Sequence, residues 1–182
     1  MRAAIVCLAT ASCALAAKAP PRDLRFFAPP APAARTFDGA TCARVRLGRF
    51  TADADLRFAL ERRVSPVERA PSETLRWADP PEFYARRAIA AALFARPLEQ
   101  AVSGPAFVLD VDVTAFEQDG GTGAVALHFE LRDDRRTLAR GDVRAVRPAA
   151  ANPAALVTAI GAALDAASSE LADRIVAAAC PR

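Results

Sequence analysis

Residues 106–132 (AFVLDVDVTAFEQDGGTGAVALHFELR) decide the fold. Apolar and polar residues alternate over 106–116 and again over 124–132, and a period of two is typical of strands that bury one face. The segment from Gln118 to Gly121 lies between them and is a hairpin turn signal. The stretch therefore predicts two antiparallel strands. Their inner faces are Phe107, Leu109, Val111, Val113, Val125, Leu127, Phe129 and Leu131.

The chain after this hairpin predicts one more strand and a long helix. A polar turn at 133–136 leads to residues 137–146, a weaker strand that extends the pair into an antiparallel meander. Asn152 is a good helix N-cap, and Pro153 suits the first helical position. Apolar residues then recur every three or four positions, which predicts an amphipathic helix lying on the sheet. They are Leu156, Ile160, Leu164, Ala167, Leu171, Ile175 and Ala178.

The chain before the hairpin predicts two strands and a first helix. Residues 42–50 (CARVRLGRF) and 56–64 (LRFALERRV) alternate, and turn-rich residues follow through Pro71. A helix is predicted from about 81 to 95, with Asp79 as its N-cap. The predicted fold class is α+β: a single mixed or antiparallel sheet of about five strands with two main helices packed on it, in the order β-β-α-β-β-β-α.

The N-terminus predicts export. Arg2 is followed by an uncharged run of mostly apolar residues, which is too short to span a membrane and is typical of a secretory signal. Thr10-Ala11-Ser12-Cys13 resembles a bacterial lipobox, in which the cysteine is lipidated and becomes the mature N-terminus. We therefore expect a signal peptide at 1–12 and a lipidated Cys13. The alternative is ordinary cleavage near Ala16-Ala17, which gives a free secreted protein.

An Ala/Pro-rich tether is predicted over residues 13–40, because proline favours extended conformations. Phe26 and Phe27 are an exception inside it. Two adjacent aromatic side chains are costly to expose to water, so they are expected to dock on the domain or on a partner. The folded domain is expected at 41–182.

The cysteines predict one disulfide. Cys7 leaves with the signal and Cys13 carries lipid, which leaves Cys42 and Cys180. Two thiols in an oxidising compartment tend to pair, so a disulfide between them is predicted. The alternative is two separately buried thiols. A zinc site is not expected, because the chain has no CxxC motif and a single histidine.

Charge and motifs give no sign of catalysis. The formal net charge is +3 and the cations are spread along the chain, which does not point to nucleic acid. His128 has Glu130 and Asp110 as candidate neighbours, but acid–base catalysis needs a second partner and a cleft, so a surface role is favoured. Asp110 and Asp112 share a face, yet calcium prefers more oxygen ligands on a loop. No GxSxG, P-loop or GxGxxG motif is present, so no enzyme, metal or cofactor is expected.

Three aromatic residues gather around the start of the first predicted helix: Trp77, Phe83 and Tyr84. One interpretation is that they seal the junction between helix and sheet. The other is an aromatic patch that binds a partner or lipid chains. The sequence leaves both interpretations open.

These features together resemble a known family. The lipobox-like Cys13, the extended Pro-containing segment and the helix opening at 75–81 (LRWADPP) are similar to the ABC-type transport auxiliary lipoproteins, including the PqiC-like proteins. Residues 107–119 (FVLDVDVTAFEQD) and the Ala-rich closing helix are similar to that family as well. The resemblance covers roughly residues 24–178.

The resemblance implies a role and a place in the cell. Members of this family are lipoprotein partners of MCE-type lipid transport systems. They sit in the periplasm, anchored to the outer membrane, and assist an inner-membrane ABC transporter and its MCE-family subunit in moving phospholipid or related hydrophobic molecules. Ala14 after the cysteine, rather than Asp, agrees with outer-membrane sorting. The resemblance implies no catalytic residue and no cofactor, and it leaves a homo-oligomer open.

The chain departs from the family pattern in two places. Thr10 stands where the lipobox normally has Leu or a similar residue, and the 65–74 connection is compact where relatives often carry a Tyr-rich hairpin. A second hypothesis belongs to a different class of function. It is a stand-alone periplasmic domain that binds a small apolar ligand in a pocket between sheet and helices.

Overall fold

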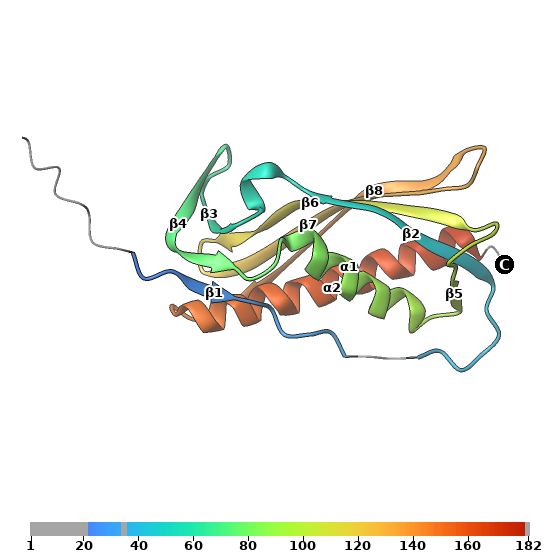
Figure 1. Ribbon diagram of the computed structural model, residues 1–182, viewed down its shortest axis with the longest axis horizontal. Coiled ribbons are helices and arrows are strands. Elements are labelled where there is room, and N and C mark those ends of the chain that lie inside the picture. The colour runs from blue at the N-terminus through green and yellow to red at the C-terminus, as the bar shows by residue number, and fades with distance from the viewer. Residues whose placement is uncertain (1–21, 34–35, 181–182) are drawn as a thin grey trace, which may run out of the picture.

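The computed structural model describes residues 22–33 and 36–180 (Figure 1). These residues form eight strands, a short 3-10 helix and two α-helices. The bounds are β1 Arg25–Phe27, β2 Ala43–Ala52, the 3-10 helix η1 Ala54–Leu56, β3 Ala59–Ser65, β4 Glu68–Trp77, α1 Pro81–Phe94, β5 Leu98–Gln100, β6 Phe107–Asp119, β7 Thr122–Arg132, β8 Thr137–Pro148 and α2 Pro153–Ala179.

The long strand β6 lies at the centre of a mixed sheet. On one side it pairs antiparallel with β7, which pairs antiparallel with β8. On its other side it pairs in parallel with two strands in turn: β2 along its first half and β3 along its last residues. β5 lies outside β2, while β4 and then β1 lie outside β3. The sheet is therefore forked on one side of β6.

The hairpin predicted from residues 106–132 is confirmed. β6 and β7 pair from Val108 with Arg132 to Asp119 with Thr122. Gly120 in the turn has a φ of 57°, a backbone conformation that favours glycine. The predicted inner-face residues of β6 and β7 are buried, apart from the partly exposed Phe107.

The prediction of about five strands in the order β-β-α-β-β-β-α is wrong in its strand count. The described residues form eight, in the order β-β-β-β-α-β-β-β-β-α. β1 and β5 have three residues each, too few to show a period. Pro71 belongs to β4 rather than to a turn. Ser72 also makes this strand hard to predict from sequence. Its hydroxyl accepts the Leu75 N–H, as in a turn, at the point where the register between β3 and β4 shifts.

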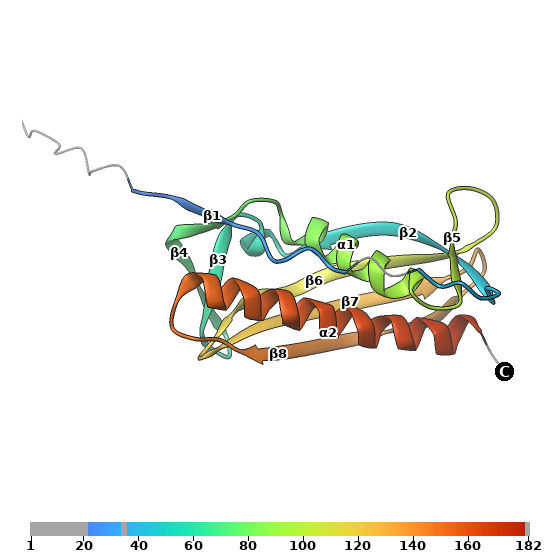
Figure 2. The same ribbon diagram turned by 90° about the horizontal axis from the view of Figure 1, so that it is seen from below.

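Both helices pack on the same face of the sheet (Figure 2). α2 begins as predicted, with Oδ1 of Asn152 accepting the Ala155 N–H at 2.8 Å. The N-cap prediction for α1 is wrong. Pro80, not Asp79, is the capping residue, and this described helix start has no side-chain cap.

α2 is long and apolar enough, by length and composition, to cross a membrane. In this structure it packs on β7 and β8 instead, as a core helix does. Gly123 of β7 permits the close approach, because an added Cβ there would lie 2.6 Å from the Ile160 backbone nitrogen. The predicted apolar face is confirmed, with Ala178 only partly buried. Its buried members are Leu156, Ile160, Leu164, Ala167, Leu171 and Ile175.

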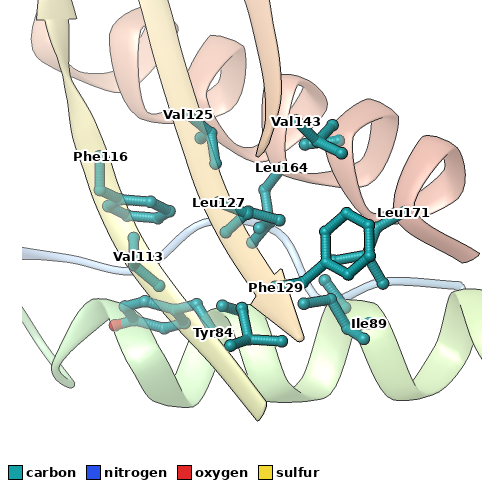
Figure 3. Packing of buried hydrophobic residues seen from close by; sticks show 14 of the residues in the cluster. Tyr84, Ile89, Val113, Phe116, Val125, Leu127, Phe129, Val143, Leu164 and Leu171 are labelled. Atoms are coloured by element: carbon teal, nitrogen blue, oxygen red, sulfur yellow. The ribbon is translucent and has the colours of Figure 1, made fainter. Parts of the chain in front are cut away.

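Buried side chains fill the space between sheet and helices (Figure 3). Phe129 of β7 lies beside Ile89 of α1 and Leu171 of α2, and all three are buried. Interiors packed in this way leave little room for a ligand.

The N-terminal segment packs on the domain. β1 pairs in parallel with β4, which places Phe27 beside Trp77 at the edge of the core. Pro29 and Pro30 then lie against α2 at Gly161, where an added Cβ would lie 2.9 Å from Cδ of Pro30. Within the segment 13–40 predicted as a tether, residues 25–30 therefore pack on the domain, as the exception made for Phe26 and Phe27 allowed.

Replacing Gly161 by leucine is expected to displace Pro29 and Pro30 from α2. Overpacking at such a contact costs about 1–3 kcal/mol. Urea unfolding measures that loss, and tryptic cleavage after Arg25 should become faster. Ala162→Leu is the matched control, because Ala162 is exposed one position further along the same helix. Equal unfolding free energies and equal cleavage rates for the two variants would contradict this role of Gly161.

Candidate interaction surfaces

The predicted lipidation site, Cys13, and the predicted signal peptide at 1–12 lie outside the described residues. The described chain begins at Arg22 and enters the fold through β1, the edge strand next to β4. The attachment of the domain to anything N-terminal is therefore made at this edge.

Cys42 and Cys180 form the predicted disulfide, with their Cα atoms 5.7 Å apart. Cys42 directly precedes β2, and Cys180 directly follows α2. The Cys42 N–H also donates to the Pro97 carbonyl at 2.8 Å. The bridge thus joins one end of the sheet to the end of the long helix, across 138 residues of sequence.

Trp77 and Tyr84 are part of the core, at 3% and 4% exposed. Both pack on Phe116: the Trp77 ring meets it edge-on with centroids 4.8 Å apart, and the Tyr84 ring is stacked at 6.1 Å. The Tyr84 hydroxyl accepts the Asp79 N–H at 2.9 Å, and burial raises the pKa of this phenol. These two residues therefore seal the junction between helix and sheet, and they offer no surface to a partner.

Phe83 and Phe26 remain available at the surface. Phe83 is 53% exposed on the first turn of α1, and Phe26 is 64% exposed on β1. Phe27, next to it, packs partly against the core. The structure thus divides the five aromatic residues predicted to contact a partner or lipid into three packed and two exposed.

The side chains that follow Phe83 on α1 are held in place. Arg86 donates to backbone carbonyls of β2 and lies over the Phe50 ring, 5.1 Å from its centroid. Arg87 lies 5.0 Å from the centroid of the Tyr84 ring. An exposed aromatic residue with ordered neighbours resembles the hot spots of protein interfaces.

His128 lies on the open face of the sheet, with Nδ1 2.8 Å from Oδ1 of Asp142. Its candidate neighbours are engaged elsewhere. Glu130 accepts the Thr137 hydroxyl at 2.6 Å, and Asp110 pairs with an arginine. Both side chains of this pair are exposed, at 43% and 81%, and acid–base catalysis would need a cleft and a second partner.

Asp110 and Asp112 are occupied by protein donors. Oδ1 of Asp110 accepts the Arg49 N–H at 2.6 Å, and its Oδ2 lies 3.3 Å from Arg132. Asp112 accepts the Thr51 hydroxyl. Over residues 22–33 and 36–180, no three His, Cys, Asp or Glu side chains come together as a metal site requires.

A buried ionic cluster joins β3, β4 and β6. Glu117 is fully buried, with Arg63 Nε donating to its Oε1 at 2.6 Å. Arg69 Nε lies 3.0 Å from its other oxygen, Oε2. Arg69 also donates to Asp55 at 2.8 Å and to the Thr114 carbonyl at 2.7 Å. This cluster, which we call the Glu117 clamp (Glu117, Arg63 and Arg69), holds the β3–β4 hairpin on β6.

The sequence pattern did not reveal the Glu117 clamp. The β6–β7 register shifts between Val113 and Ala115, which places Phe116 on the inner face of the sheet and Glu117 on the opposite face. Both are buried, Glu117 beside Arg63 and Arg69. Its partner Arg63 is 54 residues away. A local hydrophobic period cannot identify pairs of residues so far apart in the chain. No other signal in the sequence predicts the Glu117–Arg63 pair.

Glu61 of β3 is buried beside this clamp. Burial raises the pKa of its carboxyl, and the charges of Asp55 and Glu117 add to the effect. A carboxyl whose pKa is higher in the folded state contributes stability below its unfolded pKa, and that contribution is lost as the pH rises through the folded pKa.

The permanently neutral Glu61→Gln variant is therefore expected to be more stable than the parent protein at pH 7. Its advantage should shrink as the pH falls to about 4, where an ordinary glutamate becomes protonated. Urea unfolding of both proteins at the two pH values checks this. Equal or lower stability of the variant at pH 7 would contradict it. Glu68→Gln, at an exposed position of the same hairpin, serves as the control.

Two of the cavities at the surface of the described residues border α2. One of about 390 Å³ opens at the start of α2, where Leu75, Gly121 and Leu156 line it. Another of about 270 Å³ lies between the N-terminal segment and the helices, beside Pro30 and Leu164. The second hypothesis placed an apolar ligand between the sheet and the helices. Side chains of the core fill that interface.

Comparisons with known proteins bear on the family and on the fold. The family model of the ABC-type transport auxiliary lipoprotein component matches residues 29–172. The sequence has no significant match among curated proteins.

Three solved structures are similar to this chain. Protein XCC0632 from Xanthomonas campestris, of the family DUF330, has 19% identity and a TM-score of 0.70, over 84% of this chain and 95% of that chain. An uncharacterized protein has 14% identity and a TM-score of 0.66, over 79% of this chain and 99% of that chain. The hypothetical protein CT253 from Chlamydia trachomatis has 8% identity and a TM-score of 0.53, over 77% and 99%.

At such identities these structures support the fold alone. The family match says more than the fold. It runs from Pro29, in the segment that packs against α2, to Ala172 within α2, and it includes every strand except β1. The resemblance noted in the sequence is thereby confirmed, and the chain belongs to the ABC-type transport auxiliary lipoprotein component family.

Proposed function

We propose that this protein is a non-catalytic lipoprotein of the bacterial envelope that assists an ABC transporter in moving phospholipid or another hydrophobic molecule across the periplasm. Its partner is the MCE-family periplasmic subunit of that transporter. Cys13 carries the lipid and fixes the chain to the outer membrane. Family membership supports a transport-auxiliary lipoprotein, and the N-terminal signal supports export.

The observation that best supports docking on a protein partner is that Phe83 is exposed beside two arginines, Arg86 and Arg87, that are held in place. An aromatic side chain on the first turn of a rigid helix loses little conformational entropy on binding. Arg86 and Arg87 follow it on α1, already fixed by β2 and by Tyr84. Such a site suits a protein partner with an apolar pocket and an acidic rim.

Co-purification from detergent-solubilised envelopes tests this docking. With the MCE-family subunit tagged, Phe83→Ala is expected to lower the recovery of this protein by about tenfold or more, as loss of an aromatic hot spot does. Phe37→Ala is the control, because Phe37 is another exposed phenylalanine, outside α1. Recovery of Phe83→Ala at the parent level would contradict docking through α1. Failure of the parent protein to co-purify would contradict the partner itself.

The stand-alone ligand-binding hypothesis has less support. A pocket between sheet and helices would need space that Phe116, Phe129 and the α2 side chains occupy. The described geometry therefore favours a docking domain over a carrier of a small apolar ligand.

A further inference from the structure

One end of the domain gathers several chain turns, and we call it the anchor end. In the sheet, Arg63 of β3 pairs with Asp119 of β6, and Thr122 of β7 pairs with Pro148 of β8. The β3–β4 tip, the β6–β7 turn and the start of α2 therefore share this end, at the left of Figures 1 and 2. The N-terminal segment reaches it as well, because Arg22 pairs with Glu73 of β4 at 3.5 Å.

Five of the nine large exposed apolar side chains of the described residues lie at the anchor end. Val67 at the β3–β4 tip is 96% exposed, and a valine in a turn is disfavoured unless something covers it. The tip is rigidly presented, since the Glu117 clamp holds the hairpin behind it. The large exposed apolar residues of this end are Leu24, Phe26, Val64, Val67 and Val146.

Arginines accompany these residues. Arg25, Arg62 and Arg147 form no ion pair with any described carboxylate, whereas Arg144 nearby is paired with Asp119. Asp23 and Glu68 are exposed acids of this end that also form no ion pair among the described residues, so the unpaired arginines exceed the unpaired exposed acids by one. Apolar tips between unpaired arginines suit the headgroup layer of a bilayer that contains anionic phospholipid.

The position of the anchor limits which part of the domain meets the membrane. Arg22 follows Cys13 by nine residues, which span at most about 32 Å when fully extended. The opposite end lies farther away by the length of α2, roughly 40 Å for its helical rise. The anchor end therefore stays within about 32 Å of the lipid in every orientation of the domain, whereas the opposite end can point away from it.

We infer that the anchor end rests on the membrane that holds the lipid anchor, with Val64 and Val67 entering the headgroup layer and the unpaired arginines contacting anionic phosphates. This inference rests on the proposed function for its geometry, because it takes Cys13 as the attachment point. The contact is weak and reversible, and salt screens its electrostatic part. It fixes the orientation of the domain, so that α1 and Phe83 face the periplasm.

Vesicle co-sedimentation of the full chain carrying Cys13→Ser, purified after export, tests the contact without the lipid. The protein is expected to sediment with vesicles of phosphatidylethanolamine and phosphatidylglycerol, and less so at high salt. The additional pair Val64→Ser and Val67→Ser should lower the bound fraction about fivefold, by the loss of apolar burial. The matched control is Val102→Ser, because Val102 is 90% exposed but follows β5 at the opposite end.

Equal vesicle binding by the tip and control variants would overturn the inference, as would no binding by the Cys13→Ser protein. If the tip variant binds vesicles normally but no longer co-purifies with the MCE-family subunit, the tip docks on protein and the inference is wrong. The test is separate from the proposed function. If vesicle binding depends on Val64 and Val67 but the native N-terminus carries no lipid, only the proposed lipid anchor is refuted.

Discussion

Replacing Glu117 by alanine is expected to lower the free energy of unfolding by about 3–5 kcal/mol, because it leaves buried charge without its partner. Glu117 is fully buried between two arginines that are only about one-fifth exposed, at side-chain values of 20% and 22%. Without the carboxylate, Arg63 and Arg69 repel each other at the base of the β3–β4 hairpin. Urea unfolding at neutral pH measures the loss, and hydrogen exchange should show the hairpin opening first.

The control for this prediction is Glu99→Ala. Glu99 forms an ion pair with Arg44 at 3.1 Å, but both side chains are largely in solvent. Exposed pairs contribute at most about 1 kcal/mol. If Glu117→Ala is no more destabilising than Glu99→Ala, the Glu117 clamp does not hold the hairpin.

Removing the disulfide is expected to have a comparable effect. The Cys42→Ser, Cys180→Ser double variant should lose about 2–5 kcal/mol, since the bridge closes a loop of 138 residues and loop closure restricts the unfolded chain. Thermal unfolding of the parent protein with and without reductant gives an independent measurement. The reductant should lower the midpoint of the parent and leave that of the double variant unchanged. A parent protein indifferent to reductant would contradict a stabilising bridge.

The β6–β7 hairpin and both helices could be predicted because their patterns are long and local. β6 alternates from Phe107 to Ala115, and α2 keeps an apolar face along a helix of 27 residues. The short strands β1 and β5 could not be predicted in this way. Each exists only because a partner strand far along the chain, β4 or β2, supplies its hydrogen bonds.

The candidate contact residues show the same limit. The Cys42–Cys180 pair was predicted by assigning Cys7 to the signal and Cys13 to the lipid, with two separate thiols as the alternative, and the structure has the bridge. Trp77 and Phe83 could not be separated, because their difference in exposure depends on the packing of Phe116 from another element. Glu117 could not be identified for a related reason, since it is buried by arginine partners from two other strands, on the face of β6 opposite Phe116.

The mass of the mature N-terminus tests the central claim most directly. The protein is isolated from salt-washed membranes, and its N-terminal peptide is measured by mass spectrometry. Acylated Cys13 as the first residue is the predicted result. A peptide that still begins at Met1, or an unmodified N-terminus beyond Cys13, would show that no lipid holds this domain at a membrane.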